Sequence, residues 1–227
     1  MKGFLKFSPT ILFAVSALIL SWQTQAKSSD AIKYNEEDFN KLFFSQIQTL
    51  KDRGCPEDVL VILQNQHDEV VSNAQKMSFF EDNVPFIPVI SKSAIDLKKL
   101  MNMVQVGDKK GKVFIVVSAL TDNIKVSARP YYIYNVANGK SLRGKSPREA
   151  ERIVTWDGVR RCLTVEETIA LCVHTKTLSD FNLWAIGSCY SAGFIPCLWY
   201  MHSDGPMLSW DSKDSYDDFW ATPSCLK

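Results

Sequence analysis

The chain has 227 residues, of which 26 are basic and 25 acidic, which gives a formal net charge of +1. A balance this close to neutral, without a basic cluster, argues against nucleic acid as the main partner. The apolar content of 46% suits one compact domain, or one domain with a helical extension.

The first 26 residues have the layout of a secretory signal peptide. Lys2 and Lys6 precede a largely apolar run at residues 11–20, and small or polar residues lead to Ala26. The core of a bilayer needs roughly 20 apolar residues, so this run is too short for an anchor, and no later apolar stretch is long enough. We expect cleavage after Ala26, no stable membrane span in the mature chain, and an exported location, either periplasmic or extracellular.

Residues 27–80 are expected to form an N-terminal helical hairpin. The first helix opens at Asn35, a capping residue that is followed by acids in the first turn and then by apolar residues at helical spacing. Gly54 ends this helix, and Pro56 begins a second helix that runs to about Gln75.

Residues 81–227 are expected to form an α+β domain that makes one compact unit with the hairpin. Two prolines confine a strand at 84–90 to an edge or an irregular position, and the apolar run at 113–117 is typical of a buried strand. Further strands are predicted at 131–136, from Trp184 onward, at 194–202 and at 207–211. We therefore predict an α+β fold in which the helical hairpin packs on a small mixed or antiparallel sheet with a C-terminal strand meander.

The segment Gly139–Ser146, GKSLRGKS, fits the pattern of a phosphate-binding P-loop. A P-loop needs its Lys and Ser in the first turn of the following helix, whereas Pro147 pushes Ser146 out of the α region. Ser146 is better interpreted as a helix N-cap, with Glu149 completing a capping box. We therefore expect no bound nucleotide and no other cofactor.

The same helix-start pattern recurs at Thr164, where Glu167 completes a second capping box. The segments that carry a family resemblance are Gly139-Lys140, Gly144–Pro147, Leu163–Glu167, Ile169–Leu171, Gly187-Ser188, Pro196, Leu198-Trp199, Pro206 and Leu208. Through them the chain resembles, over roughly residues 80–225, an uncharacterised bacterial family catalogued only as a domain of unknown function. The resemblance implies no activity, cofactor or site residues.

All six cysteines, at positions 55, 162, 172, 189, 197 and 225, follow the expected cleavage site. An even number behind a signal peptide favours disulfides. Cys189 and Cys197 form the most local candidate pair because they flank an expected hairpin turn. Buried free thiols are the alternative.

Histidine and cysteine patterns predict neither a catalytic residue nor a metal site. Cys172 and His174 lie two positions apart, which on a helix places them on nearly opposite faces. His67 is expected to be a solvated helix residue and His202 a strand-end residue. The H-E-x-x-H, C-x-x-C and G-x-S-x-G signatures are absent from the sequence.

The C-terminal segment combines aromatic and acidic residues in an unusual density. The predicted ligand-binding residues are Trp199, Tyr200, Trp210, Asp211 and Trp220. Aromatic faces beside carboxylates suit a sugar or a protein partner. The alternative is that Trp199 fills the core, together with Ile195, Cys197 and Met201 on one strand face.

The sequence therefore favours a non-enzymatic binding or accessory protein of the cell envelope or extracellular space. One alternative is an extracytoplasmic carboxylate-dependent hydrolase that uses acids such as Asp204 and Asp211, and another is a disulfide-stabilised structural envelope protein. A pocket with two facing carboxyl groups would favour the enzyme, and a flat aromatic patch would favour binding.

Overall fold

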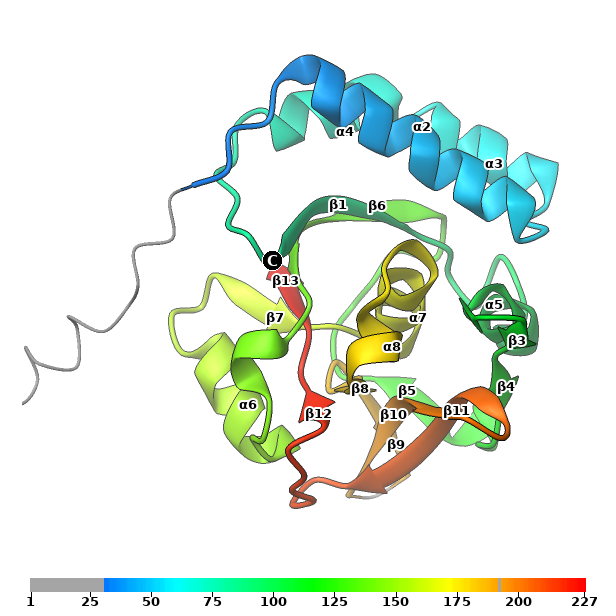
Figure 1. The fold of residues 1–227 in the computed structure, drawn as a ribbon, viewed down its shortest axis with the longest axis vertical. Helices are drawn as coiled ribbons and strands as arrows, with labels where there is room; N and C mark the ends of the chain where they lie inside the picture. Colours follow the sequence, from blue (N-terminus) through cyan, green and yellow to red (C-terminus); the bar gives the residue numbers. More distant parts are fainter. Residues whose placement is uncertain (1–30, 192) are drawn as a thin grey trace, which may run out of the picture. The chain divides into compact units, whose positions relative to one another are not determined.

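The computed structural model describes residues 31–191 and 193–227, so the expected signal peptide lies outside the described residues. Residues Ile32–Lys227 form one unit, in which two sheets enclose a central helix and further helices cover the outside (Figure 1). This arrangement confirms the predicted α+β class.

The N-terminal helices are α2 (Glu36–Asp52), α3 (Glu57–Gln64) and α4 (His67–Ala74). Asn35 caps α2 through the expected capping box. The predicted single second helix is two helices, because the backbone of Gln66 leaves the helical region with ψ near 1°. The Gln66 side chain also donates hydrogen bonds to the carbonyls of Ile62 and Pro130, which fixes the break.

The first sheet is antiparallel and has the order β1-β6-β13-β7. Its strands are β1 (Asn83–Val89), β6 (Tyr131–Ala137), β13 (Ser224–Leu226) and β7 (Arg160–Cys162). The proline-containing strand β1 lies at an edge, as its missing N–H donors require. The C-terminal residues fill the position between β6 and β7, which sequence reasoning missed because this pairing is long-range.

The second sheet is mixed and has the main order β12-β8-β10-β11-β4, with β9 and β5 joined to it beside β10. Its strands are β12 (Trp220–Ala221), β8 (Asn182–Trp184), β10 (Phe194–Met201), β11 (Gly205–Ser212), β4 (Lys112–Val113), β9 (Ser188–Tyr190) and β5 (Leu120–Asp122). The antiparallel hairpin β10–β11 is its longest pairing and corresponds to the predicted C-terminal meander.

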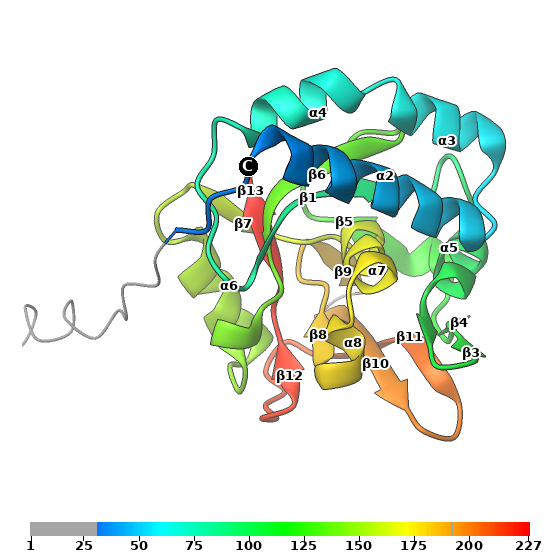
Figure 2. The same ribbon diagram turned by 45° about the horizontal axis from the view of Figure 1, so that its top comes forward.

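Helix α7 (Val165–His174) lies between the two sheets and contacts both β1 and β10 (Figures 1 and 2). Every residue from Val165 to Val173 is buried. The remaining helices are α5 (Leu97–Met103), α6 (Pro147–Thr155) and α8 (Thr177–Asp180), and β2 (Gln105–Val106) pairs with β3 (Lys109–Lys110) in a small hairpin. A second, smaller core under α6 holds Ala150, Val154, Trp184, Ile195 and Cys197.

The apolar run at 113–117 is not the buried strand that we predicted. Only Lys112 and Val113 pair with β11, after which the chain leaves the sheet and forms a 3-10 helix at Val117–Ala119. Phe114 is 57% exposed and Val116 is 61% exposed. The prediction of burial was therefore wrong. A run of apolar residues does not determine which of its side chains are covered by other elements.

The segment GKSLRGKS forms a turn and a capped helix start, as predicted. Ser146 is the N-cap of α6 with an extended backbone, and its hydroxyl accepts from the Glu149 N–H at 3.3 Å. The Glu149 carboxylate does not close the capping box but pairs with Lys145 Nζ at 3.0 Å. The N–H groups of Arg143, Gly144 and Lys145 donate to carbonyls within the protein. They are therefore not directed toward a phosphate position.

All six cysteines are free thiols in the part of the chain that the structure describes, which corrects the disulfide prediction. Cys197 pairs with Trp184, whereas the pairing of β9 with β10 places Cys189 beside Ile195. The strand geometry separates the two cysteine Cα atoms by about 8 Å, beyond the reach of a disulfide. The Cys189 thiol instead donates to the carbonyl of Ser191 at 3.0 Å.

Within the described residues, no helix has the length and apolar character needed to cross a bilayer.

Candidate functional site

Four of the five predicted ligand-binding residues are divided between the two faces of the β10–β11 hairpin, and the fifth, Trp220, lies on β12. Residues that pair directly across antiparallel strands point to the same face. Trp199 pairs with Met207 and Asp211 with Ile195, whereas Tyr200 pairs with Pro206 and Trp210 with Pro196. Trp199 and Asp211 therefore share one face, and Tyr200 and Trp210 point to the other.

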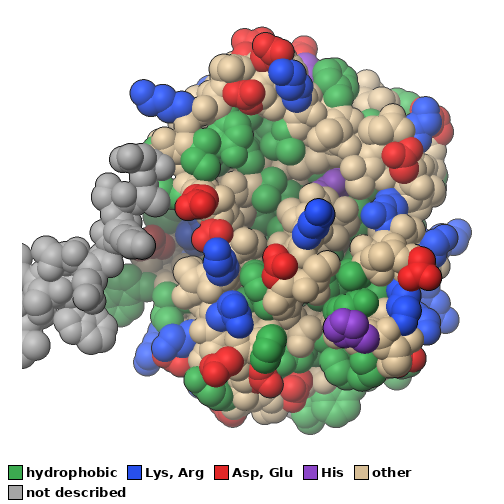
Figure 3. Space-filling model, in the orientation of Figure 1, with side chains coloured by type: hydrophobic (Ala, Val, Ile, Leu, Met, Phe, Trp, Pro, Cys, Tyr) green, Lys and Arg blue, Asp and Glu red, His purple; other side chains and the backbone are tan. Residues whose placement is uncertain are grey.

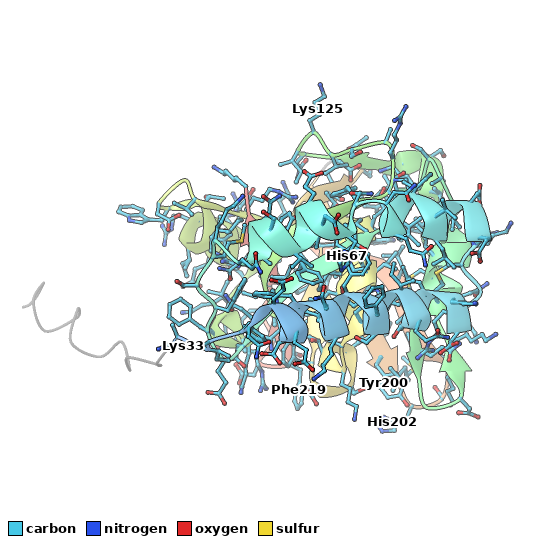
Figure 4. All side chains as sticks on the ribbon, turned by 90° about the horizontal axis from the view of Figure 1, so that it is seen from above. Lys33, His67, Lys125, Tyr200, His202 and Phe219 are labelled. Carbon is cyan, nitrogen blue, oxygen red and sulfur yellow. The ribbon has the colours of Figure 1, made fainter. Side chains whose placement is uncertain are left out.

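Tyr200 and Trp210 are occupied by neighbouring rings. Tyr200 packs against the main core and lies 5.1 Å from the His202 ring, centroid to centroid (Figure 4). Trp210 stacks on Tyr190 at 5.9 Å and meets Phe194 edge-on at 4.5 Å. Tyr200 therefore has a packing role on the opposite face from Trp199, whereas Trp210 is 44% exposed and also borders a hollow that Trp199 lines.

The Trp199 face of the hairpin carries a surface groove made of two adjoining hollows, which we call the aromatic groove. The first hollow, of about 350 Å³, is lined by Phe114, Trp199, Met201, Asp204, Met207 and Ser209. The second, of about 230 Å³, is lined by Cys197, Trp199, Ser209, Trp210, Asp211 and Trp220. Trp199 and Ser209 belong to both hollows, so the two are continuous.

The aromatic groove exposes apolar surface. Phe114 is 57% exposed and Met201 is 36% exposed. The indole N–H of Trp199 is buried and has no hydrogen-bond partner. Trp220 is held in place by stacking on Trp184, with ring centroids 4.1 Å apart. The floor of the groove is therefore apolar and fixed.

A carboxylate stands at each end of the aromatic groove. Asp204 is exposed and accepts from the Ser203 hydroxyl at 2.5 Å. Asp211 accepts from the Ser212 N–H at 2.6 Å and from the Ser215 hydroxyl at 2.7 Å. Six residues of β11 lie between the two acids, which places their Cα atoms up to about 23 Å apart. The carboxyl groups of glycosidases lie about 5 to 10 Å apart, so these two acids do not form a facing catalytic pair.

Sequence reasoning missed Phe114, Met201 and Met207 as groove residues. Phe114 was assigned to a buried strand, and Met201 to a face that fills the core. The alternating pattern of β10 was read correctly, because Ile195 and Cys197 on that face do fill the second core. The face passes from core to groove beyond Cys197, where α6 no longer covers the sheet, and no local signal marks that change.

The start of α7 holds a buried ion network around Glu167. Arg161 donates two hydrogen bonds of 2.7 Å to the two carboxylate oxygens, and the Tyr131 hydroxyl donates another of 2.7 Å. The Thr164 N–H donates to the same carboxylate at 2.9 Å, which closes the predicted capping box. Burial alone would lower the pKa of Arg161, but its hydrogen bonds to Glu167 outweigh burial and raise it. Both oxygens of Glu167 are thus satisfied.

A second ion network includes Glu166, the neighbouring acid. Lys92 Nζ lies 3.1 Å from Glu166 and 2.5 Å from Asp122, and Asp122 accepts from the Ser188 hydroxyl at 2.6 Å. Burial raises the pKa of Glu166. One Glu166 oxygen has no partner, and the residue lines a cavity of about 10 Å³, which holds one water at most. The two ion networks thus give the acids of the segment Leu163–Glu167 a structural role.

The histidines form no site with one another. His67 is the first residue of α4, and its ring nitrogens contact Asn40 of α2 at 2.8 Å and Asp68 at 2.7 Å (Figure 4). Cys172 is buried, and both Cys172 and His174 line a pocket at the C-terminal end of α7. Among the residues that the structure describes, no cluster of three His, Cys, Asp or Glu side chains is arranged to hold a metal ion.

Fold and site together define an α+β domain whose most distinctive surface feature is an aromatic groove. Basic and acidic side chains are interspersed on the face drawn in Figure 3. Residues 46–194 match a family of unknown function, DUF5701, and because this match covers more than half of the chain, the protein belongs to that family. No curated protein and no solved structure matches the chain.

Proposed function

We propose that the protein is an exported binding or accessory protein of the cell envelope or extracellular space, and that it holds a segment of a partner protein in the aromatic groove. The observation that carries this proposal is the exposure of Phe114 and Met201 beside Trp199 in one continuous groove. Large apolar side chains are seldom left exposed in a contiguous patch unless they bind something.

The chemistry of the aromatic groove favours a protein segment with apolar side chains and a basic residue. Methionine and aromatic residues are enriched at protein interfaces, where they adapt to apolar side chains. Asp204 and Asp211 at the groove ends complement a Lys or Arg of the partner.

Two alternative functions lose their structural support. A hydrolase based on Asp204 and Asp211 needs a facing pair of acids, whereas these two acids lie at opposite ends of the aromatic groove. A disulfide-stabilised scaffold needs paired cysteines, whereas the six cysteines of the described residues are free.

The test is selection of a random peptide library displayed on phage against the purified chain that starts at Lys27. We expect selected peptides to combine apolar and basic residues, and to lose at least tenfold in affinity toward Phe114→Ser and Met201→Ser. Both positions are exposed, so the variants should remain folded. Asp204→Asn should weaken the basic peptides in a salt-dependent manner.

The matched control is Trp156→Ser, which removes a tryptophan that is 86% exposed and lies outside the aromatic groove. Peptides that bind the groove should bind this variant normally. Peptides equally weakened by Trp156→Ser, or unaffected by Phe114→Ser, would overturn the proposed site. Binding of oligosaccharides on a glycan array, with no peptide selected, would overturn the choice of a protein partner.

The exported location is tested separately by intact mass after cell fractionation. We expect a chain that begins at Lys27 outside the cytoplasm and takes up six alkyl groups when it is unfolded without reductant. An uncleaved chain in the cytoplasm would overturn the proposed location, whereas the groove would still be tested by the peptide experiment.

A further inference from the structure

The C-terminal end of α7 opens into a pocket that is separate from the aromatic groove and that the proposed function does not use. Its volume is about 350 Å³, which is within the range of small-molecule sites. It is formed where the end of α7 meets the C-cap of α2 and the β2–β3 hairpin, and its polar lining residues include Arg53, Gln105, His174, Thr175, Lys176 and Ser179.

Polar atoms in this pocket lack hydrogen-bond partners. Both ring nitrogens of His174 and the Nη1 atom of Arg53 are buried and unpaired. Buried polar groups are almost always hydrogen-bonded, because an unpaired one has lost its hydrogen bonds to water without replacing them. Two of the residues that line the pocket, Arg53 and His174, thus carry two unused donors, an Arg N–H and an imidazole N–H, together with one imidazole acceptor.

The charged residues that line the pocket have one sign. Arg53 and Lys176 are basic, and no carboxylate lines the pocket among the described residues. Burial and the nearby charge of Arg53 lower the pKa of His174 to about 3, so the imidazole is neutral at physiological pH. The partial negative charge at the C-terminal end of α2 offsets part of the Arg53 charge. Lys176 is the second positive charge that attracts an anion to the pocket.

We propose that this pocket binds a small organic acid, whose carboxylate is held by Arg53 and His174 and whose carbon chain lies against Val106, Val173 and Leu178. An arginine guanidinium matches the geometry of a carboxylate, and the imidazole N–H supplies a further donor. The three apolar lining residues favour an aliphatic chain over a bare inorganic ion.

The experiment is an NMR titration of the full mature chain with butyrate, in which the His174 ring signals are followed. We expect saturable shifts of the His174 ring and none with butyramide, which has the same size but no charge. Arg53→Gln should weaken butyrate binding at least tenfold. The control Lys51→Gln removes a basic residue from the last turn of the same helix, outside the pocket, and should leave binding unchanged.

Several outcomes would overturn the proposal. Shifts that do not saturate, or that Lys51→Gln reduces as much as Arg53→Gln, would mean diffuse attraction to surface charge. Equal binding of butyramide would mean that no carboxylate is recognised, and saturation by inorganic phosphate without butyrate binding would exclude the organic acid. The wild-type titration does not depend on the variants, so a variant that fails to fold leaves the test intact.

Discussion

The two ends of helix α7 differ in how their buried polar atoms are paired. At the N-terminal end, both oxygens of Glu167 are paired, and the one unpaired oxygen of Glu166 adjoins room for a single water. At the C-terminal end, His174 and Arg53 keep unpaired atoms beside a pocket of about 350 Å³. A buried charge whose hydrogen bonds are all made stabilises the fold. Donors without partners beside a pocket are instead available to bind a ligand.

The largest expected effect is at the satisfied end. Glu167→Gln leaves the Arg161 guanidinium buried without its anion, and breaking a buried pair costs roughly 3 to 5 kcal/mol. Urea unfolding measures the loss. Glu149→Gln is the matched control, because Glu149 is the third residue of a capped helix but pairs with Lys145 at the surface, so its loss should be under about 1 kcal/mol. Equal losses of stability in Glu167→Gln and Glu149→Gln would contradict the expected difference between a buried and a surface ion pair.

The next effect concerns acid stability at the unsatisfied end. The pKa of His174 is lowered from 6.5 to about 3, so below pH 6.5 the unfolded state takes up a proton that the folded state refuses. This contribution to stability is present above pH 6.5 and is lost as the pH falls toward 3. Between pH 7.5 and pH 5 the loss is about 2 kcal/mol at most.

His174→Phe should therefore lose less stability than the wild type between pH 7.5 and pH 5, as measured by urea unfolding at both values. His202→Phe, which removes an exposed histidine, serves as the control. Parallel pH profiles for wild type and His174→Phe would show that His174 is protonated in the folded protein, and the contrast between the ends of α7 would weaken.

A smaller effect separates the two capped helices. Thr164→Ala removes the hydroxyl that accepts the buried N–H of Glu167, and we expect a loss of about 1 to 2 kcal/mol. Ser146→Ala at the start of α6 should lose about 1 kcal/mol or less, because water reaches that N-terminus and replaces the cap. Thermal unfolding of both variants compares them directly, and a larger loss at Ser146 would contradict this ranking.

The smallest expected effect on stability is that of Arg53→Gln. Because Arg53 Nη1 has no partner, its removal should change the free energy of unfolding by less than about 0.5 kcal/mol. Urea unfolding measures this change. A loss of several kcal/mol would give Arg53 a structural role like that of Arg161, and the two ends of α7 would then no longer differ.

Local patterns in the sequence determined much of the fold. The caps at Asn35, Ser146 and Thr164 were predictable because capping depends on residues within one helical turn. Pro147 excluded a P-loop geometry through its effect on the preceding residue alone. The edge position of β1 followed from two prolines that cannot donate to a neighbouring strand.

Tertiary structure alone decided what is covered and what is open. Strand β13 completes a sheet with residues about 65 to 90 positions earlier in the chain, and Phe114 is exposed because β4 pairs for only two residues. The aromatic groove and the His174 pocket both arise where elements distant in sequence meet. The periodicity of a sequence describes the faces of one helix or strand. Burial depends on which other element packs against each face, and that packing is determined by residues distant in the sequence.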